Sequence, residues 1–199
     1  MKRQWMLFGI HQQGAHTHTR HIQDQLDPQN ADQMRLYQGL NVTAGHISTY
    51  PIFQGCRIQP LFDGTETYPK MLTAIQEAKK SVYLSTYIFG TRGIGQSFIE
   101  ALQAASRRGV EVKVLIDGLG SLYSWPTAYR KLRNSGVPVR LFLPPFRKWY
   151  YTLHVNLRNH QKILVIDGQL GFTGGLNIHE NNFARNPHVL PKISDLHFK

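Results

Sequence analysis

From Pro60 onward, segments with helical spacing of apolar residues alternate with short segments rich in β-branched and aromatic residues. The spacing predicts helices over 68–80, 94–109 and 126–136. It predicts strands over 81–89, 110–117, 137–143, 161–167 and 169–175, the last two joined by a hairpin-like reversal at Gly168. Because helices and strands alternate, we predict an α/β layered domain with a mixed, mostly parallel β-sheet flanked by helices.

Residues 1–57 lack this pattern and are polar and rich in histidine. We predict that they form an extension without a core of its own, and that 58–199 form the folded domain. Histidines 11, 16, 18 and 21 match no closed zinc spacing, and no nearby cysteine assists them. We therefore expect no metal site there.

The composition limits the possible surroundings of the chain. No apolar run approaches the roughly 20 residues of a membrane-spanning helix, and the apolar stretch near the start is too short for a signal peptide. The single cysteine, Cys56, excludes an internal disulfide framework. A formal net charge of +11 favours polyanionic partners, which leaves both nucleic acid and anionic lipid open.

Candidate chemistry concentrates in the motif His160-x-Lys162, Asp167, Gly174-Gly175-x-Asn177. Side chains of a strand alternate between its faces, so His160 and Lys162 project from the same face. Asp167 is an odd number of residues from His160 and points to the opposite face of an unbroken strand. We infer that Asp167 mainly stabilises the strand and its turn.

The remaining motif residues suit phosphoryl transfer without a metal or other cofactor. A neutral His160 imidazole can attack phosphorus, while Lys162 neutralises the non-bridging oxygens and Asn177 donates from its amide. Gly174 and Gly175 carry no Cβ, so their backbone amides can approach a phosphate. An exposed strand face without function is the alternative for an isolated His-x-Lys, but the further residues at fixed offsets favour a catalytic motif.

This motif resembles the HKD signature of the phospholipase D superfamily. Together with LFDGTETYPKMLTAIQEAKKSVYLSTYIF, ALQAASRRGVEVKVLIDGLGS, NLRNHQKILVIDG and GFTGGLNI, it is similar to the first half of bacterial cardiolipin synthases over about residues 58–199. The resemblance implies that His160 forms a phosphohistidine, that Lys162 and Asn177 bind phosphate, and that Asp167 completes the motif. It further implies an acidic residue that accepts a hydrogen bond from the other nitrogen of His160, for which Asp195 is the candidate.

The chain departs from the family pattern at two points. Gly175 stands where many relatives have serine, so a hydroxyl donor is missing. Members use two motifs, one histidine attacking and the other protonating the leaving alcohol, whereas this chain has one. We expect either a half that is truncated at its C-terminus or two copies that pool their histidines about a two-fold axis.

The resemblance implies a phosphatidyltransferase of the cardiolipin synthase type that transfers a phosphatidyl group between phospholipids. A dimeric single-motif nuclease or phosphodiesterase and an inactive half-enzyme remain alternatives. The expected partners are anionic phospholipids resembling phosphatidylglycerol, a peripheral membrane surface and a second HKD half, with nucleic acid less favoured. The expected location is cytoplasmic, at the inner face of the cell membrane.

Two further features remain open to more than one interpretation. The segment 146–160 mixes aromatic and basic residues, which suits a phospholipid headgroup region or single-stranded nucleic acid, or else ordinary core aromatics with a basic rim. Asp117 ends a predicted strand, where it either lines a crevice of the α/β sheet or shapes the turn before Gly118.

Overall fold

The computed structural model describes residues 57–144, 158–182 and 195–199, together with seven helical residues between 32 and 43. By contacts the chain divides into two units, Met1–Arg57 and Ile58–Lys199. The histidines predicted to lie in an N-terminal extension, and most of the aromatic and basic segment 146–160, lie outside the described residues. The architecture below is that of the second unit.

Three α-helices form where the apolar spacing predicts them. They are α2 (Asp63–Glu77), α3 (Ile94–Arg107) and α4 (Ala128–Asn134). Helix α2 begins earlier than predicted because the Glu66 carboxylate accepts a hydrogen bond of 2.9 Å from the Phe62 amide. Asp63 and Glu66 also place negative charge in the first turn, where it opposes the helix dipole. The single turns η2 (Gly120–Tyr123) and η4 (Glu180–Asn182) complete the helical elements of the described second unit.

Seven strands form one sheet in the order β1-β7-β6-β5-β2-β3-β4. They are β1 (Pro60–Phe62), β2 (Ser81–Thr86), β3 (Glu111–Asp117), β4 (Val139–Phe142), β5 (Ile163–Ile166), β6 (Leu170–Gly174) and β7 (Leu196–Phe198). The predicted α/β class with a mixed sheet and flanking helices is confirmed. The prediction that most strand pairs are parallel is wrong, because only β2–β3 and β3–β4 are parallel and the other pairs are antiparallel.

The local connections explain this mixture of directions. Helices α3 and α4 carry the chain back across the sheet between β2, β3 and β4, which makes those strands parallel. The predicted reversal between β5 and β6 is confirmed as an antiparallel hairpin, with positive φ angles of 54° at Asp167 and 71° at Gly168. A short turn of this kind can join only antiparallel strands.

The Asp167 side chain anchors the hairpin turn to the turn between α2 and β2. Its carboxylate accepts hydrogen bonds from the amides of Lys79 (3.0 Å), Lys80 (2.8 Å) and Ser81 (2.8 Å). These backbone donors are the largest cause of the lowered pKa of Asp167. Asp167 thus stabilises the strand end and its turn, as the sequence predicted, although β5 covers only Ile163–Ile166 and Asp167 acts from the turn.

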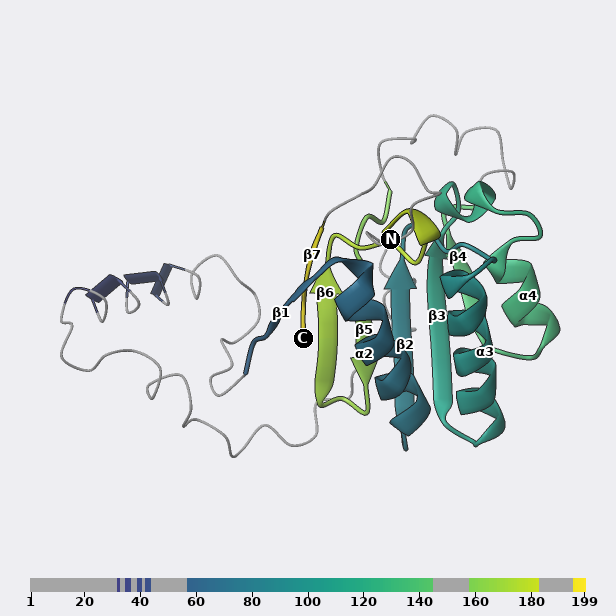
Figure 1. Ribbon diagram of the computed structural model, residues 1–199, viewed down its shortest axis with the longest axis horizontal. Coiled ribbons are helices and arrows are strands. Elements are labelled where there is room, and N and C mark those ends of the chain that lie inside the picture. Colours follow the sequence, from purple (N-terminus) through teal and green to yellow (C-terminus); the bar gives the residue numbers. More distant parts are fainter. Residues whose placement is uncertain are drawn as a thin grey trace. The chain divides into compact units, whose positions relative to one another are not determined.

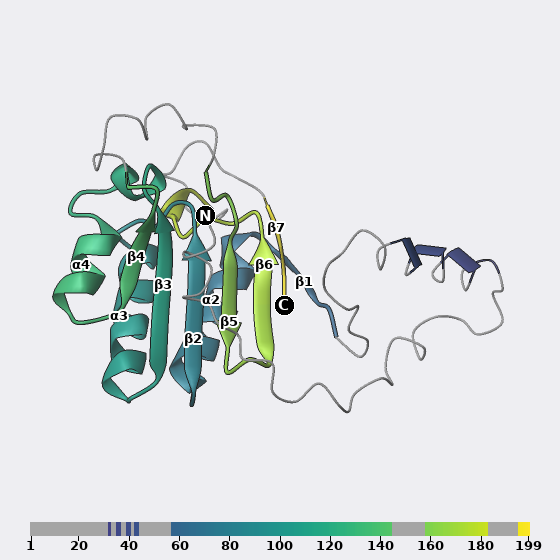
Figure 2. The same ribbon diagram turned by 180° about the vertical axis from the view of Figure 1, so that it is seen from behind.

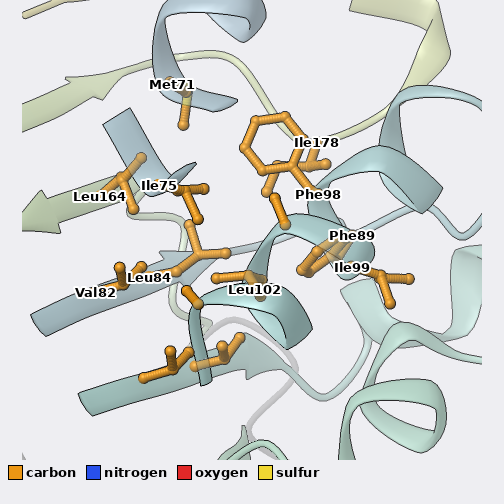
Figure 3. Close-up of a cluster of buried hydrophobic side chains, with 14 of the residues drawn as sticks. Met71, Ile75, Val82, Leu84, Phe89, Phe98, Ile99, Leu102, Leu164 and Ile178 are labelled. Atoms are coloured by element: carbon orange, nitrogen blue, oxygen red, sulfur yellow. The ribbon is translucent and has the colours of Figure 1, made fainter. Parts of the chain in front are cut away.

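Helices α2, α3 and α4 lie against one face of the sheet, as the opposite views in Figures 1 and 2 show. The core forms between this face and the helices, where Phe98 and Leu102 of α3 and Ile75 of α2 meet Leu84 and Leu164 of the central strands (Figure 3). Among the described residues, no helix is long and apolar enough to cross a membrane.

One histidine is buried inside the sheet. His197 of β7 pairs with Leu61 on one side and Gly174 on the other, and is only 1% exposed. Neither ring nitrogen has a hydrogen-bond partner in the described part of the chain. Burial is the main cause that lowers the pKa of His197 from 6.5 to about 4, and the positive charge of Lys162 adds to it.

We expect Asp167→Ala to lower the free energy of unfolding by about 1–3 kcal/mol, because three backbone donors lose their acceptor. Asp167→Asn retains a side-chain oxygen and tolerates positive φ, so its loss should be smaller. Urea denaturation of both variants measures this. Equal stability of Asp167→Ala and the unmodified chain would contradict the anchoring role.

We expect His197 to make stability depend on pH in the acid range. Since its folded pKa of about 4 lies below the unfolded value of 6.5, folding excludes a proton in that window, and stability falls as the pH is lowered. Each pH unit within the window costs about 1.4 kcal/mol.

The matched variant is His197→Leu, which has no titrating ring. The difference in unfolding free energy between the two proteins should change by about 2 kcal/mol between pH 6.5 and pH 5, while the contributions of carboxylates cancel. A difference that does not vary with pH would show that His197 titrates normally.

Candidate functional site

His160 and Lys162 come together on the ring of Tyr87, the residue that follows β2. The His160 and Tyr87 rings have centroids 4.2 Å apart and are inclined by 36°. The Lys162 Nζ lies 5.7 Å from the centroid of the same ring and donates a hydrogen bond of 2.6 Å to the His160 carbonyl. The histidine and the lysine of the motif therefore both lie close to the Tyr87 ring, and His160 is exposed.

Ile88, the residue after Tyr87, binds the side chain of Asn177. Its side-chain Oδ1 accepts a hydrogen bond of 3.1 Å from the Ile88 amide, while Nδ2 has no hydrogen-bond partner among the described residues. The hydroxyl of the buried Tyr68 donates a hydrogen bond to the Asn177 carbonyl. The amide group thus has its acceptor engaged and its donor available.

The buried carboxylate of Asp117 holds the start of the motif. One oxygen accepts a hydrogen bond of 3.1 Å from the Asn159 amide, and the other accepts from the Leu119 amide at 2.9 Å. The guanidinium of Arg158 lies 3.8 Å from Asp117 and is itself largely buried. Asp117 therefore shapes the turn after β3 and also positions the residue before His160, but it does not face solvent in a crevice.

Gly174 and Gly175 fit closely against β7. A Cβ at Gly174 would lie 2.4 Å from the Leu196 carbonyl oxygen and 2.7 Å from the His197 Cα, so backbone occupies the place of a side chain. A Cβ at Gly175 would lie 2.2 Å from the Asp195 carboxylate. The Gly175 amide donates to the Leu196 carbonyl at 3.1 Å, so it pairs within the sheet region.

Asp195 lies beside Gly175, and its negative charge acts on Lys162. Burial lowers the pKa of Lys162, and Asp195 opposes this shift. One Asp195 oxygen accepts a hydrogen bond of 2.7 Å from the Leu196 amide. No hydrogen bond joins Asp195 to His160, both of which the structure describes, so an orienting role for Asp195 stays a prediction.

The structure does not bring Asp167 to the other motif residues. It lies past the far end of β5, beyond about 13 Å of strand from the end that carries Lys162. The gathered set therefore consists of His160, Lys162, Asn177 and, through its charge on Lys162, Asp195. None of the described residues forms a His, Cys, Asp or Glu group suited to a metal ion.

Sequence reasoning missed the aromatic residues that organise the site. The pattern of apolar residues places Tyr87 only within a strand, although the carboxyl end of a strand next to a parallel neighbour is where sites of open α/β sheets form. Tyr68 carried no signal, because a tyrosine on an apolar helix face is usually a core residue. The hydrogen bond that its hydroxyl donates depends on the position of the loop that carries Asn177.

The chain is similar to several curated bacterial proteins. It is 35% identical over 139 residues to cardiolipin synthase 1 of Bacillus cereus, covering 70% of this chain and 27% of that protein. It is 33% identical over 167 residues to the cardiolipin synthase of Alkalihalophilus pseudofirmus, covering 83% and 33%. It is 28% identical over 158 residues to the probable cardiolipin synthase YwiE of Bacillus subtilis, covering 79% and 31%. The chain thus matches about a third of the length of these relatives.

Two solved structures share the fold. The phospholipase D family member Nuc from Salmonella typhimurium superposes with a TM-score of 0.52 at 24% identity, covering 71% of this chain and 80% of that one. NucT from Helicobacter pylori gives 0.54 at 20% identity, covering 71% and 83%. The family model described as cardiolipin synthase, PLD-like domain matches residues 71–198, which include the whole motif, and this chain therefore belongs to the phospholipase D superfamily as a cardiolipin synthase-like domain.

Proposed function

We propose that the chain is a phosphatidyltransferase half-site of the cardiolipin synthase type. The observation that carries the proposal is the convergence of His160 and Lys162 on Tyr87, in a domain whose relatives are cardiolipin synthases. His160 attacks the phosphorus of a phosphatidyl donor, forming an N–P bond as the P–O bond to an alcohol such as glycerol breaks. The hydroxyl of a second phospholipid then attacks the phosphohistidine and takes the phosphatidyl group.

Each residue of the site has a part in this reaction. The Lys162 ammonium neutralises the non-bridging oxygens, and the available Nδ2 of Asn177 donates to one of them. Tyr87 fixes the plane of the imidazole. Asp195 balances the charge of Lys162, and we infer that it accepts a hydrogen bond from the other ring nitrogen of His160 once substrate is bound.

The leaving alcohol needs a proton from a second histidine. We propose that a second HKD half supplies it, either from a further part of a longer protein or from a second copy of the chain. The site then works on anionic phospholipids at the cytoplasmic face of the cell membrane. A single-motif nuclease is the second candidate, because the net charge of +11 also attracts nucleic acid.

His160→Ala should lower cardiolipin formation from phosphatidylglycerol vesicles by at least about 1,000-fold, since the nucleophile is lost. Gln161→Ala is the matched control, because Gln161 is an exposed neighbour whose side chain forms no hydrogen bond with the described residues. Lipid products and the covalent adduct on the peptide containing His160 are followed by mass spectrometry, and the dimer fraction by size-exclusion chromatography.

Three results of this experiment would count against the proposal. Activity that survives His160→Ala would remove the nucleophile assignment. Cleavage of DNA without any turnover of lipid would favour the nuclease. A dimer that binds lipid but forms no adduct would leave the inactive half-enzyme as the better description.

Asp195→Asn should slow turnover by about 100-fold or more, because it removes the partner of the imidazole and the charge that balances Lys162. The acid limb of the pH profile should shift as well, which a purely structural role would not cause. Glu77→Gln, an exposed carboxylate change on α2, is the control. A normal rate with a normal pH profile would exclude Asp195 from the site.

A further inference from the structure

Three large apolar side chains stand exposed on the turn that follows β3. Leu122 is 47% exposed, Tyr123 63% and Trp125 74%, the last being the highest value of any large apolar side chain in the described part of the chain. Single exposed apolar residues are ordinary, whereas a contiguous group marks an interaction surface. We call these three residues, with Arg130 and Arg133 of α4, the aromatic rim.

The backbone beneath the aromatic rim is held in place by hydrogen bonds. Asp117 accepts from the amides of Leu119 and Gly120, and the Ser121 hydroxyl donates to the Gly118 carbonyl at 2.7 Å. A Cβ at Gly120 would lie 1.8 Å from the Tyr87 carbonyl oxygen, so this turn packs directly on the segment that carries the site. The apolar side chains are thus presented outward from a fixed support.

The segment that carries the aromatic rim contains basic residues and no acidic ones. No Asp or Glu occurs between residues 118 and 166, and Asp117, which precedes this interval in the sequence, is buried beside Arg158. The Arg130 guanidinium lies 5.7 Å from the centroid of the Trp125 ring. Arg133 donates a hydrogen bond of 3.2 Å to the Tyr129 hydroxyl. Neither arginine forms an ion pair with any described residue, so both retain their charge for a partner.

The aromatic rim also borders the candidate site. Tyr123 is near enough to Tyr87 to contribute to the raised pKa of Tyr87, whose main cause is burial. Tyr87 carries the His160 ring. A partner seated on the rim would therefore place its outermost groups next to the nucleophile.

We propose that the aromatic rim docks the protein on a bilayer that contains anionic phospholipid. Trp125, Tyr123 and Leu122 enter the boundary between headgroups and acyl chains, where amphipathic rings are favoured. Arg130 and Arg133 lie at the level of the phosphates. A bilayer fits better than single-stranded nucleic acid because Leu122 has no face on which a base can stack. The inference rests on the proposed function only for the identity of the lipid that His160 meets.

The test measures binding to vesicles separately from turnover, using the full chain with His160→Ala so that no lipid is consumed. Vesicles contain phosphatidylcholine with or without phosphatidylglycerol. The apolar variant is Leu122→Ser/Tyr123→Ser/Trp125→Ser, and its matched control is Ile58→Ser/Phe62→Ser, two residues of similar exposure on another part of the domain. The charge variant is Arg130→Gln/Arg133→Gln, with Arg92→Gln/Arg107→Gln as its control. Circular dichroism and thermal unfolding establish that each variant is folded.

We expect the apolar variant to bind vesicles at least about tenfold more weakly, and its control to bind as the parent does. The charge variant should lose about fivefold in affinity for each arginine, and only on vesicles that contain phosphatidylglycerol. With Trp5→Phe/Trp149→Phe, Trp125 is the sole tryptophan, and its emission should shift to shorter wavelength on vesicles.

The proposal is overturned if both rim variants bind as their controls do, or if Trp125 emission does not change. It is also overturned if single-stranded DNA binds more tightly than vesicles and the apolar variant loses that binding, which would make the rim a nucleic-acid surface. Loss of vesicle binding in the rim variants supports docking even where the parent with His160 intact turns over no lipid. In the presence of a second HKD half, that combination refutes the proposed function and leaves the docking proposal standing.

Discussion

The antiparallel pairing of β5 with β2 is the constraint on which the candidate site depends. Ser85 lies opposite Ile163, so the chain enters β5 at the end of the sheet where β2 leaves it. This places His160 and Lys162 beside Tyr87, the residue that follows β2. The bridge between Phe89 and Ile178 then ties the Asn177 loop to the same segment. Three consecutive residues after β2, Tyr87, Ile88 and Phe89, thus contact functional segments that are far apart in the sequence.

A buried carboxylate makes this entry rigid. Asp117 is fully buried, and such a charge is tolerated only where hydrogen bonds and an opposite charge compensate it. Backbone amides from two segments and the Arg158 guanidinium supply that compensation. The same group therefore fixes the turn that supports the aromatic rim and the residue that precedes His160. Docking surface and nucleophile share one internal anchor, which keeps their separation constant.

Local patterns were enough to predict the helices, most strands and the β5–β6 hairpin. The period of the apolar residues and the Asp167-Gly168 turn are read from neighbouring residues alone. The relative directions of the strands were not predictable in the same way. Strand β5 pairs with β2 across more than 70 intervening residues, and a local pattern carries no information on such a pairing. The three-residue strand β1 is too short to show alternation, and it exists only through its pairing with β7.

The motif predicted the identity of the chemical groups better than their geometry. His160 and Lys162 lie close to Tyr87, and Asn177 is bound to the next residue, Ile88. The supporting roles of Tyr87, Tyr68 and Asp117 arise from contacts between segments that are far apart in the sequence. His197 could be predicted least, since a histidine two residues after Asp195 looks like an exposed strand residue. Its burial follows from the pairing of β7 with both β1 and β6.

Stability and chemistry occupy opposite ends of β5, and this separation has a consequence for pH. Asp167 at one end and His197 beside the site both have lowered pKa values, from hydrogen bonds in the first case and from burial in the second. Protonation of either group favours the unfolded chain, so the two contributions add rather than cancel as the pH falls. Acid pH therefore lowers the stability of the sheet that positions His160 through two groups, Asp167 and His197. Loss of activity at acid pH contains this structural part in addition to any protonation of the nucleophile, and the two are separable because only the structural part changes with His197.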